Sequence, residues 1–180
     1  MSRRNIAFLL TVVLGVLADQ LTKAWVVANI EHRVGEIVIV PGWLSLVHAQ
    51  NHGAAWGMLS DFAYRHLVFG AFTVVAVGFL VDTLRRLPRD DTFVAGSLGL
   101  ILSGALGNAI DRVRQQYVTD FVRVYTEHPT LAPWLRENLG SNEWPSFNVA
   151  DSALVVGVIL FLVYFLVAED REPEPAAEST

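Results

Sequence analysis

Two aspartates in the C-terminal half of the chain carry side chains that could work together as an acid and a base. Asp120 lies in the short stretch VTDF, and Asp151 lies in FNVAD. Two carboxyl groups at one partly dry site can share a single proton, so that one activates water and the other protonates a carbonyl or a leaving group. This chemistry needs neither a metal nor a thiol, and the chain has no cysteine. The pair is therefore typical of an aspartyl protease.

The surroundings of the two aspartates differ in the way that an acid and a base require. Apolar neighbours of Asp120 would raise its pKa, whereas helix amides near Asp151 favour an ionised carboxylate. Each residue also has a simpler interpretation when taken alone. Asp120 would be an ordinary loop acid, and Asp151 would be an N-cap or first-turn residue.

Four apolar stretches must position these side chains. Of the 180 residues 53% are hydrophobic and only 17% are charged, which is unusual for a soluble domain of this length. A helix needs about 20 mostly apolar residues to cross a bilayer. The first stretch exceeds the length of a signal peptide and lacks a clean cleavage site, so we expect it to be retained. The predicted spans are residues 6–30, 66–84, 93–110 and 149–168 of a single polytopic domain, 1–168.

Arginine clusters orient these spans. One cluster lies at 3–4 and another at 85–89. Short basic segments mark the cytoplasmic side, so both termini are predicted to be cytoplasmic. The net charge of −5 offers no basic surface for nucleic acid. The predicted outer loops are residues 31–65 and 112–148, and the Pro- and Glu-rich tail 169–180 is predicted to be disordered.

The first outer loop contains a predicted hairpin. Glu36–Val40 and 44–47 are rich in β-branched and apolar residues, and Pro41-Gly42 between them is a turn signal. We expect a small sheet on the outer membrane face. We also expect this loop to close over the site as a flap that includes Trp56.

Costly polar groups converge on the outer side of this topology. A charged group at a helix centre costs roughly 2.5–3.5 kcal/mol on insertion scales, and less near the membrane edge. Unrelated polar groups would be scattered over both sides of the membrane, whereas groups that lie together on one side indicate a single site. The groups are Asp19, Lys23, Asn51, Asn108, Asp111, Arg112, Asp120, Asn148 and Asp151.

Some of these residues have structural interpretations of equal or greater weight. Asp19 and Lys23 are four residues apart and could form an ion pair or contact substrate. Arg112 follows Asp111 directly and Asn108 lies three residues before it, which favours a supporting role for Asp111 over catalysis.

Two further spacings are weaker signals. Gly99, Ser103 and Gly107 recur on one helix face and favour close helix packing in lipid. His48 and His52 have the spacing of a zinc pair, but no carboxylate–histidine motif surrounds them, so we expect no metal and no cofactor.

Five short motifs that contain the polar residues above, taken in order along the chain, form a set that resembles bacterial lipoprotein signal peptidase, the type II signal peptidase family. The resemblance implies a mainly α-helical membrane protein with four transmembrane helices, a small periplasmic β-sheet (the cradle) and a periplasmic loop. It further implies a multi-pass enzyme of the bacterial inner membrane that cleaves diacylglyceryl-modified prolipoproteins before the lipidated cysteine. The motifs are DQLTK at 19–23, NHGAAWG at 51–57, GNAIDR at 107–112, VTDF at 118–121 and FNVAD at 147–151.

The resemblance also assigns roles to individual residues. The family's catalytic aspartates fall on Asp120 and Asp151. Trp56 stands where phenylalanine is common, and the segment between the two aspartates is longer than usual. A monomer would suffice, with the prolipoprotein and membrane lipids as its partners. The substrate-binding and supporting residues fall on Asp19, Lys23, Asn51, Gly53, Asn108, Asp111, Arg112, Asn148 and Ala150.

Two other classes of function compete with this interpretation. A small transporter or proton-path protein would carry polar residues through the full membrane depth, yet Asp82 is the only acid on the inner side of a predicted span. A non-catalytic scaffold would keep its function after Asp120 or Asp151 is replaced by asparagine.

Overall fold

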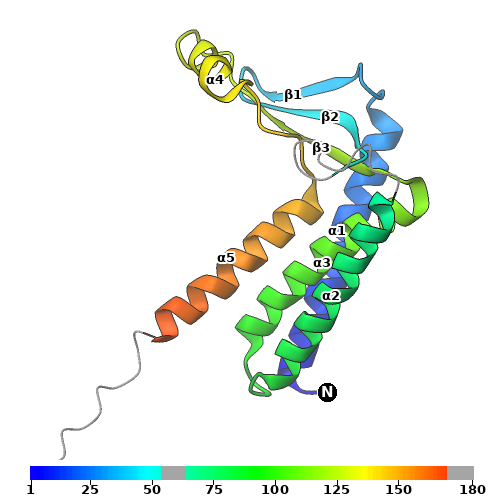
Figure 1. Cartoon of the computed structure of the whole chain (residues 1–180), viewed down its shortest axis with the longest axis vertical. Coiled ribbons are helices and arrows are strands. Elements are labelled where there is room, and N and C mark those ends of the chain that lie inside the picture. Colours follow the sequence, from blue (N-terminus) through cyan, green and yellow to red (C-terminus); the bar gives the residue numbers. More distant parts are fainter. Residues whose placement is uncertain (54–63, 170–180) are drawn as a thin grey trace, which may run out of the picture.

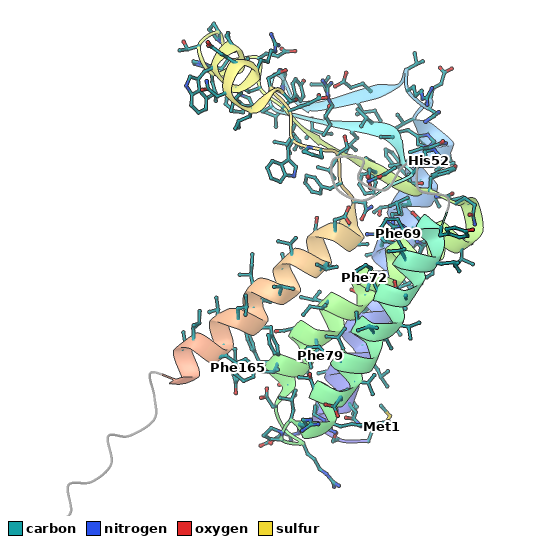
Figure 2. The ribbon with its side chains drawn as sticks, viewed as in Figure 1. Met1, His52, Phe69, Phe72, Phe79 and Phe165 are labelled. Carbon is teal, nitrogen blue, oxygen red and sulfur yellow. The ribbon has the colours of Figure 1, made fainter. Side chains whose placement is uncertain are left out.

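The computed structural model describes residues 1–53 and 64–169, and within them four long apolar helices form the body of the molecule. They are long and apolar enough to cross a membrane, and many large apolar side chains on them are exposed. Figure 2 labels three of these, Phe72 and Phe79 on α2 and Phe165 on α5. The predicted fold class, mainly α-helical with four spans, is confirmed. The helices are α1 (Arg3–Asn29), α2 (Arg65–Arg86), α3 (Thr92–Gln115) and α5 (Val149–Glu169).

Helix α3 lies at the centre, with α1 and α5 packed against it through small residues. A Cβ on Gly99 would lie 2.9 Å from the carbonyl oxygen of Phe8 in α1. A Cβ on Gly157 of α5 would lie 2.8 Å from the carbonyl oxygen of Ser97. Such contacts leave no room for a side chain, and they bring the helix backbones close together. The packing role predicted for the small-residue face of α3 is therefore confirmed.

A three-stranded antiparallel sheet covers one end of these helices, here called the sheet end (Figure 1). The predicted hairpin is confirmed, and Gly42 adopts the positive φ of 75° that its turn requires. The sequence predicted no third strand. Residues of the second outer loop form it, because the backbone of β2 offers them an antiparallel partner. The strands, in sheet order, are β1 (Glu36–Val40), β2 (Leu44–Asn51) and β3 (Val118–Val124).

A short helix, α4 (Leu131–Leu139), follows β3 and was also absent from the sequence prediction. It ends at Gly140, whose φ of 77° terminates the helix in the left-handed conformation. The chain then returns beside β3, where Phe147 pairs with Val122. Figure 1 shows α4 at the end of the sheet that lies farthest from α2.

The predicted disordered tail begins at 169. Glu169 is the last residue of α5, and 170–180 lie outside the described residues.

Candidate active site

Asp120 lies on β3, not in a loop, and it is almost completely buried. It pairs with Ala49 of β2, and its side chain accepts a hydrogen bond on each oxygen. Asn51 Nδ2 donates to Oδ2 at 3.0 Å, and Asn148 Nδ2 donates to Oδ1 at 2.7 Å. Burial, together with the nearby charge of Asp151, raises the pKa of Asp120 to about 7, although both amide donors act in the opposite direction.

Asp151 lies in the first turn of α5 and is held by two donors of its own. Asn108 Nδ2 donates to Oδ1 at 2.7 Å, and the Asn148 backbone N–H donates to Oδ2 at 3.1 Å. In return, the Asp151 N–H donates to Asn148 Oδ1 at 2.9 Å. This exchange is a capping box, in which Asn148 caps α5 and Asp151 occupies the third helical position.

The amide of Asn148 joins the two aspartates. It is fully buried, caps the helix that carries Asp151, and donates to Asp120. It also donates to Asn108 Oδ1 at 3.2 Å, and Asn108 in turn holds Asp151. Asn148 thus contacts both carboxyl groups, while Asn51 supplies the second donor to Asp120 and Asn108 supplies the second donor to Asp151.

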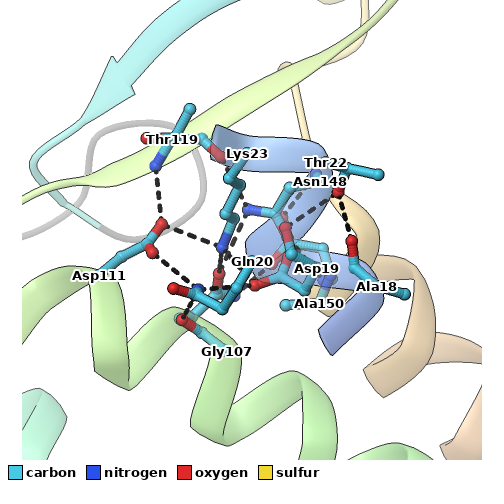
Figure 3. A network of polar contacts seen from close by, with 12 residues as sticks. Ala18, Asp19, Gln20, Thr22, Lys23, Gly107, Asp111, Thr119, Asn148 and Ala150 are labelled. Carbon is cyan, nitrogen blue, oxygen red and sulfur yellow. Dashed lines mark hydrogen bonds and ion pairs between the residues drawn. The ribbon is translucent and has the colours of Figure 1, made fainter. Parts of the chain in front are cut away.

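Lys23 holds the next layer of the site together (Figure 3). Its Nζ lies 2.9 Å from Asp19 Oδ2, 3.0 Å from Asp111 Oδ2 and 3.1 Å from Asn108 Oδ1. All three ammonium hydrogens are therefore used, and the side chains of both ion pairs are buried. The ion pair, one of the two roles that the spacing of Asp19 and Lys23 allowed, is present. Lys23 also fixes Asn108, which holds Asp151.

Asp19 and Asp111 also attach neighbouring elements to this layer. Asp19 Oδ1 accepts from the Ala150 N–H at 2.9 Å, which links α1 to the start of α5. Asp111 Oδ2 accepts from the Thr119 N–H at 3.1 Å, which links α3 to the strand that carries Asp120. Asp111 pairs with Lys23, not with its neighbour in sequence, Arg112.

Sequence reasoning missed Gln20. Its Nε2 donates to Asp19 at 3.1 Å, to Asp111 at 3.0 Å and to the Gly107 carbonyl at 3.3 Å. A carboxamide inside an apolar span, three residues from Lys23 and so on the same helix face, is the signal that could have identified it.

Arg112 lies on the last turns of α3 and faces the segment after β2. Its Nη2 donates to the Gly53 carbonyl at 3.2 Å, and its guanidinium carbon lies 4.2 Å above the ring of Phe69. The Gly53 N–H donates to Asn51 Oδ1 at 3.0 Å, so Arg112 and Asn51 both hold this glycine. Trp56, part of the predicted flap, lies outside the described residues.

The two histidines of the possible zinc spacing make separate contacts. His48 Nδ1 lies 3.1 Å from the Ile30 carbonyl oxygen, and His52 lies against Tyr117. Within residues 1–53 and 64–169, no group of three or more histidines and acids is placed to hold a metal ion.

Comparison with known proteins identifies the family of this chain. Residues 11–167 match the model of the family described as signal peptidase (SPase) II. A lipoprotein signal peptidase of Geobacter metallireducens is 39% identical over 165 residues, which are 92% of this chain and 93% of that protein. Its counterpart in Geobacter sulfurreducens is 41% identical over 91% of this chain and 94% of that protein.

Solved structures agree with the sequence matches. A bacterial membrane enzyme solved by the in meso method at 2.3 Å has a TM-score of 0.76 and 29% identity, and the match covers 95% of this chain and 94% of that one. A second, solved by the same method at 1.9 Å, has a TM-score of 0.71 and 30% identity over 88% of this chain and 92% of that one. The chain belongs to the signal peptidase II family.

Proposed function

We propose that this chain is an intramembrane aspartyl endopeptidase that removes the signal peptide from diacylglyceryl-modified prolipoproteins and cleaves before the lipidated cysteine. Family membership, and relatives named lipoprotein signal peptidase, support the protease activity and the substrate class. The aspartyl mechanism is supported by one observation above all. Asp120 and Asp151 are held around the shared amide of Asn148 at the sheet end of four apolar helices.

The two aspartates divide the chemistry of amide hydrolysis between them. Asp151, held by two N–H donors, is the carboxylate that takes a proton from the attacking water. Asp120, whose pKa is raised to about 7, carries the shared proton and gives it to the carbonyl oxygen of the scissile bond. The C–N bond of the tetrahedral intermediate then breaks as the proton held by Asp151 passes to the leaving nitrogen, which becomes the amine of the lipidated cysteine. One hydroxyl of the intermediate returns its proton to Asp120, so that the signal peptide leaves as a carboxylic acid and both aspartates regain their starting states.

The remaining polar residues position this pair. Lys23 and Asn108 orient Asp151, and Asn51 orients Asp120, so we assign them supporting roles. The resemblance places Asn51 among the substrate-binding and supporting residues, and its contact with Asp120 supports a positioning role. Among the described residues, Arg112 donates to the carbonyls of Gly53 and Asn108, and its other N–H groups suit a carbonyl of an extended substrate segment.

The location of the site suits a substrate that is itself anchored in the membrane. A signal peptide is an apolar helix, and its end would reach the sheet end of the bundle. The arginine clusters at the opposite end support an orientation in the bacterial inner membrane with cytoplasmic termini and a periplasmic site. All groups of the site come from one chain, so a monomer suffices.

Cleavage of a diacylglyceryl-modified prolipoprotein in lipid or detergent tests the proposal. The wild type is compared with Asp120→Asn, Asp151→Asn and Asp111→Asn, each checked for folding. Asp120→Asn and Asp151→Asn are expected to lose cleavage completely, because the amide of the new asparagine cannot take up or release the shared proton. Asp111→Asn is the matched control, since it keeps an acceptor for the Thr119 N–H and is expected to retain part of the activity.

Other outcomes would replace the assignment. If Asp111→Asn is folded but inactive while Asp120→Asn still cleaves, the partner of Asp151 is Asp111. If the wild type fails to cleave several modified substrates, the protease assignment itself is wrong.

A further inference from the structure

The short helix α4, in the long segment between the two aspartates, presents an apolar face that no described element covers. Leu131 is 38% exposed, Trp134 is 55% exposed and Leu139 is 70% exposed. Elsewhere on the helix, Ala132 is buried and Leu135 is half-buried. The charged residues Arg136 and Glu137 lie around the other side of the helix, because successive residues are turned by about 100°.

An apolar groove of about 740 Å³ lies beside this face. Three leucines of α4 line one side, and aromatic residues at the end of the sheet line the other. Tyr125 N–H donates to the Trp43 carbonyl at 3.0 Å, so these two residues are held next to each other by the backbone. Lining residues of the groove include Leu131, Leu135, Leu139, Trp43, Tyr125 and Trp144.

The same apolar surface continues to the outer ends of the spanning helices along the edge of the sheet. Strand β1 begins shortly after α1 ends, and all five of its residues are exposed. Val40 of β1 pairs with Leu44, and Leu44 pairs with Val124, so apolar side chains cross the sheet next to Trp43. Figure 1 shows that the sheet leads sideways from the helices to α4.

We infer that α4 and its groove dock into the outer leaflet of the bilayer, where the groove takes up phospholipid acyl chains. The spanning helices already fix the bilayer beside the sheet, and exposed apolar residues of β1 lie on the sheet that leads from them to α4. Tryptophan is enriched at membrane interfaces because its ring is apolar and its N–H can stay hydrated, and Trp43, Trp134 and Trp144 gather here. The helix thus anchors the far end of the sheet, as an interfacial amphipathic helix does.

The charges around the groove show which force drives this docking. This part of the chain carries three carboxylates, on Glu127, Glu137 and Glu143, and two guanidinium groups, on Arg123 and Arg136, and Arg123 forms an ion pair with Glu143. The region therefore has no cationic excess to attract anionic lipid. The docking depends on burial of apolar surface, and it should persist in neutral lipid and at high salt.

Fluorescence quenching in proteoliposomes of phosphatidylcholine tests the inference. The chain has no cysteine, so Leu139→Cys and Leu131→Cys each give one position for an environment-sensitive label. Glu137→Cys on the charged side of α4 is the matched control. Labels at 131 and 139 are expected to be quenched by lipids brominated on the acyl chain and protected from aqueous iodide. The label at 137 should show the reverse, and raising the salt concentration should change neither result.

Three results would overturn the inference. In the first, iodide quenches the labels at 131 and 139 as strongly as the label at 137. In the second, protection at 131 and 139 appears only after a lipid-modified substrate is added, which would make the groove a substrate subsite. In the third, protection depends on the density of protein in the vesicle, which would make the face a contact between two copies. None of these results bears on whether Asp120 and Asp151 are catalytic.

Discussion

Lys23 is the residue on which the polar cluster depends most, because two buried carboxylates share its charge. Asp19 is completely buried, and Asp111 is nearly so. A buried ion pair contributes little net stability when both partners are compared with apolar residues, but a buried charge left without its partner is strongly unfavourable. Here one ammonium group balances two carboxylates, so the cluster tolerates the loss of Lys23 poorly.

We expect Lys23→Met to lower the free energy of unfolding by about 3–5 kcal/mol, since it leaves two carboxylates buried without a cation. Unfolding in detergent micelles measures the change. Arg86→Met is the control, because its ion pair with Asp82 is exposed, with side chains 77% and 58% accessible, and such pairs contribute about 0–1 kcal/mol. Equal losses in the two variants would show that Lys23 does not hold the cluster together.

The raised pKa of Asp120 gives the activity a defined pH dependence. Below about pH 7 the carboxyl group keeps its proton, and above that value it loses the proton that the scissile carbonyl needs. The cleavage rate should therefore fall as the pH rises through about 7, with the slope of a single ionisation. Rates measured from pH 5 to 9 on a folded enzyme check this, and a rate that keeps rising to pH 9 would exclude Asp120 as the acid.

The raised pKa of Asp120 also makes the free energy of unfolding depend on pH. The folded protein binds the Asp120 proton more tightly than the unfolded chain, whose carboxyl has a pKa near 3.8. The stabilisation of the fold by this tighter proton binding is complete below pH 3.8 and is lost as the pH rises through about 7. Ionisation of Asp120 within the fold therefore opposes folding in neutral and alkaline solution.

At the scale of elements, the site depends on how closely α3 and α5 approach. Asn108 and Asp111 lie on α3, and Asn148 and Asp151 lie at the start of α5, so the distance between these helices sets the hydrogen bonds between them. Small residues on both helices make the approach possible.

A methyl group on Gly104 should therefore reduce both stability and activity. Its Cβ would collide with the Ala150 carbonyl oxygen and lie 2.9 Å from the Leu154 Cβ, and a backbone oxygen cannot move aside cheaply. We expect Gly104→Ala to destabilise the protein by about 1–3 kcal/mol and to slow cleavage. Gly78→Ala on α2 is the control, because no described atom lies within 4 Å of the new methyl. Unfolding in micelles and cleavage assays should separate the two variants, and a normal Gly104→Ala enzyme would refute the packing role.

At the scale of the whole molecule, the apolar helices and the arginine clusters predict how the chain lies in the membrane. The cluster at 85–89 begins in the last turn of α2 and continues into the loop before α3, at the opposite end from the sheet. Because basic segments stay in the cytoplasm, the sheet and the active site should face outward.

Labelling of single introduced cysteines tests this orientation, because the chain has no cysteine. A membrane-impermeant maleimide should label Glu137→Cys on α4 in intact spheroplasts, because this position is exposed and predicted to be periplasmic. Asp90→Cys, in the loop before α3, should react only after the membrane is permeabilised. The opposite pattern would place the active site in the cytoplasm and contradict the proposed location.

The sequence by itself determined the four long helices, the hairpin and most residues of the candidate site. The thickness of a bilayer fixes the length of an apolar span, and turn residues mark a hairpin, so both features can be found in local patterns. The convergence of the polar residues also followed from the sequence, because a topology with an even number of spans assigns each helix end to one side.

Only the tertiary structure decided how those residues contact one another. Asp120 lies on β3 because β2 offers it a backbone partner, and strand pairing depends on hydrogen bonds between segments far apart in the chain. The pairing of Lys23 with Asp111, and the placement of Asn148 between the two aspartates, depend on the contact of α3 with α1 and α5. The direction of a buried side chain is set by all of its neighbours at once, and a linear pattern does not contain that information.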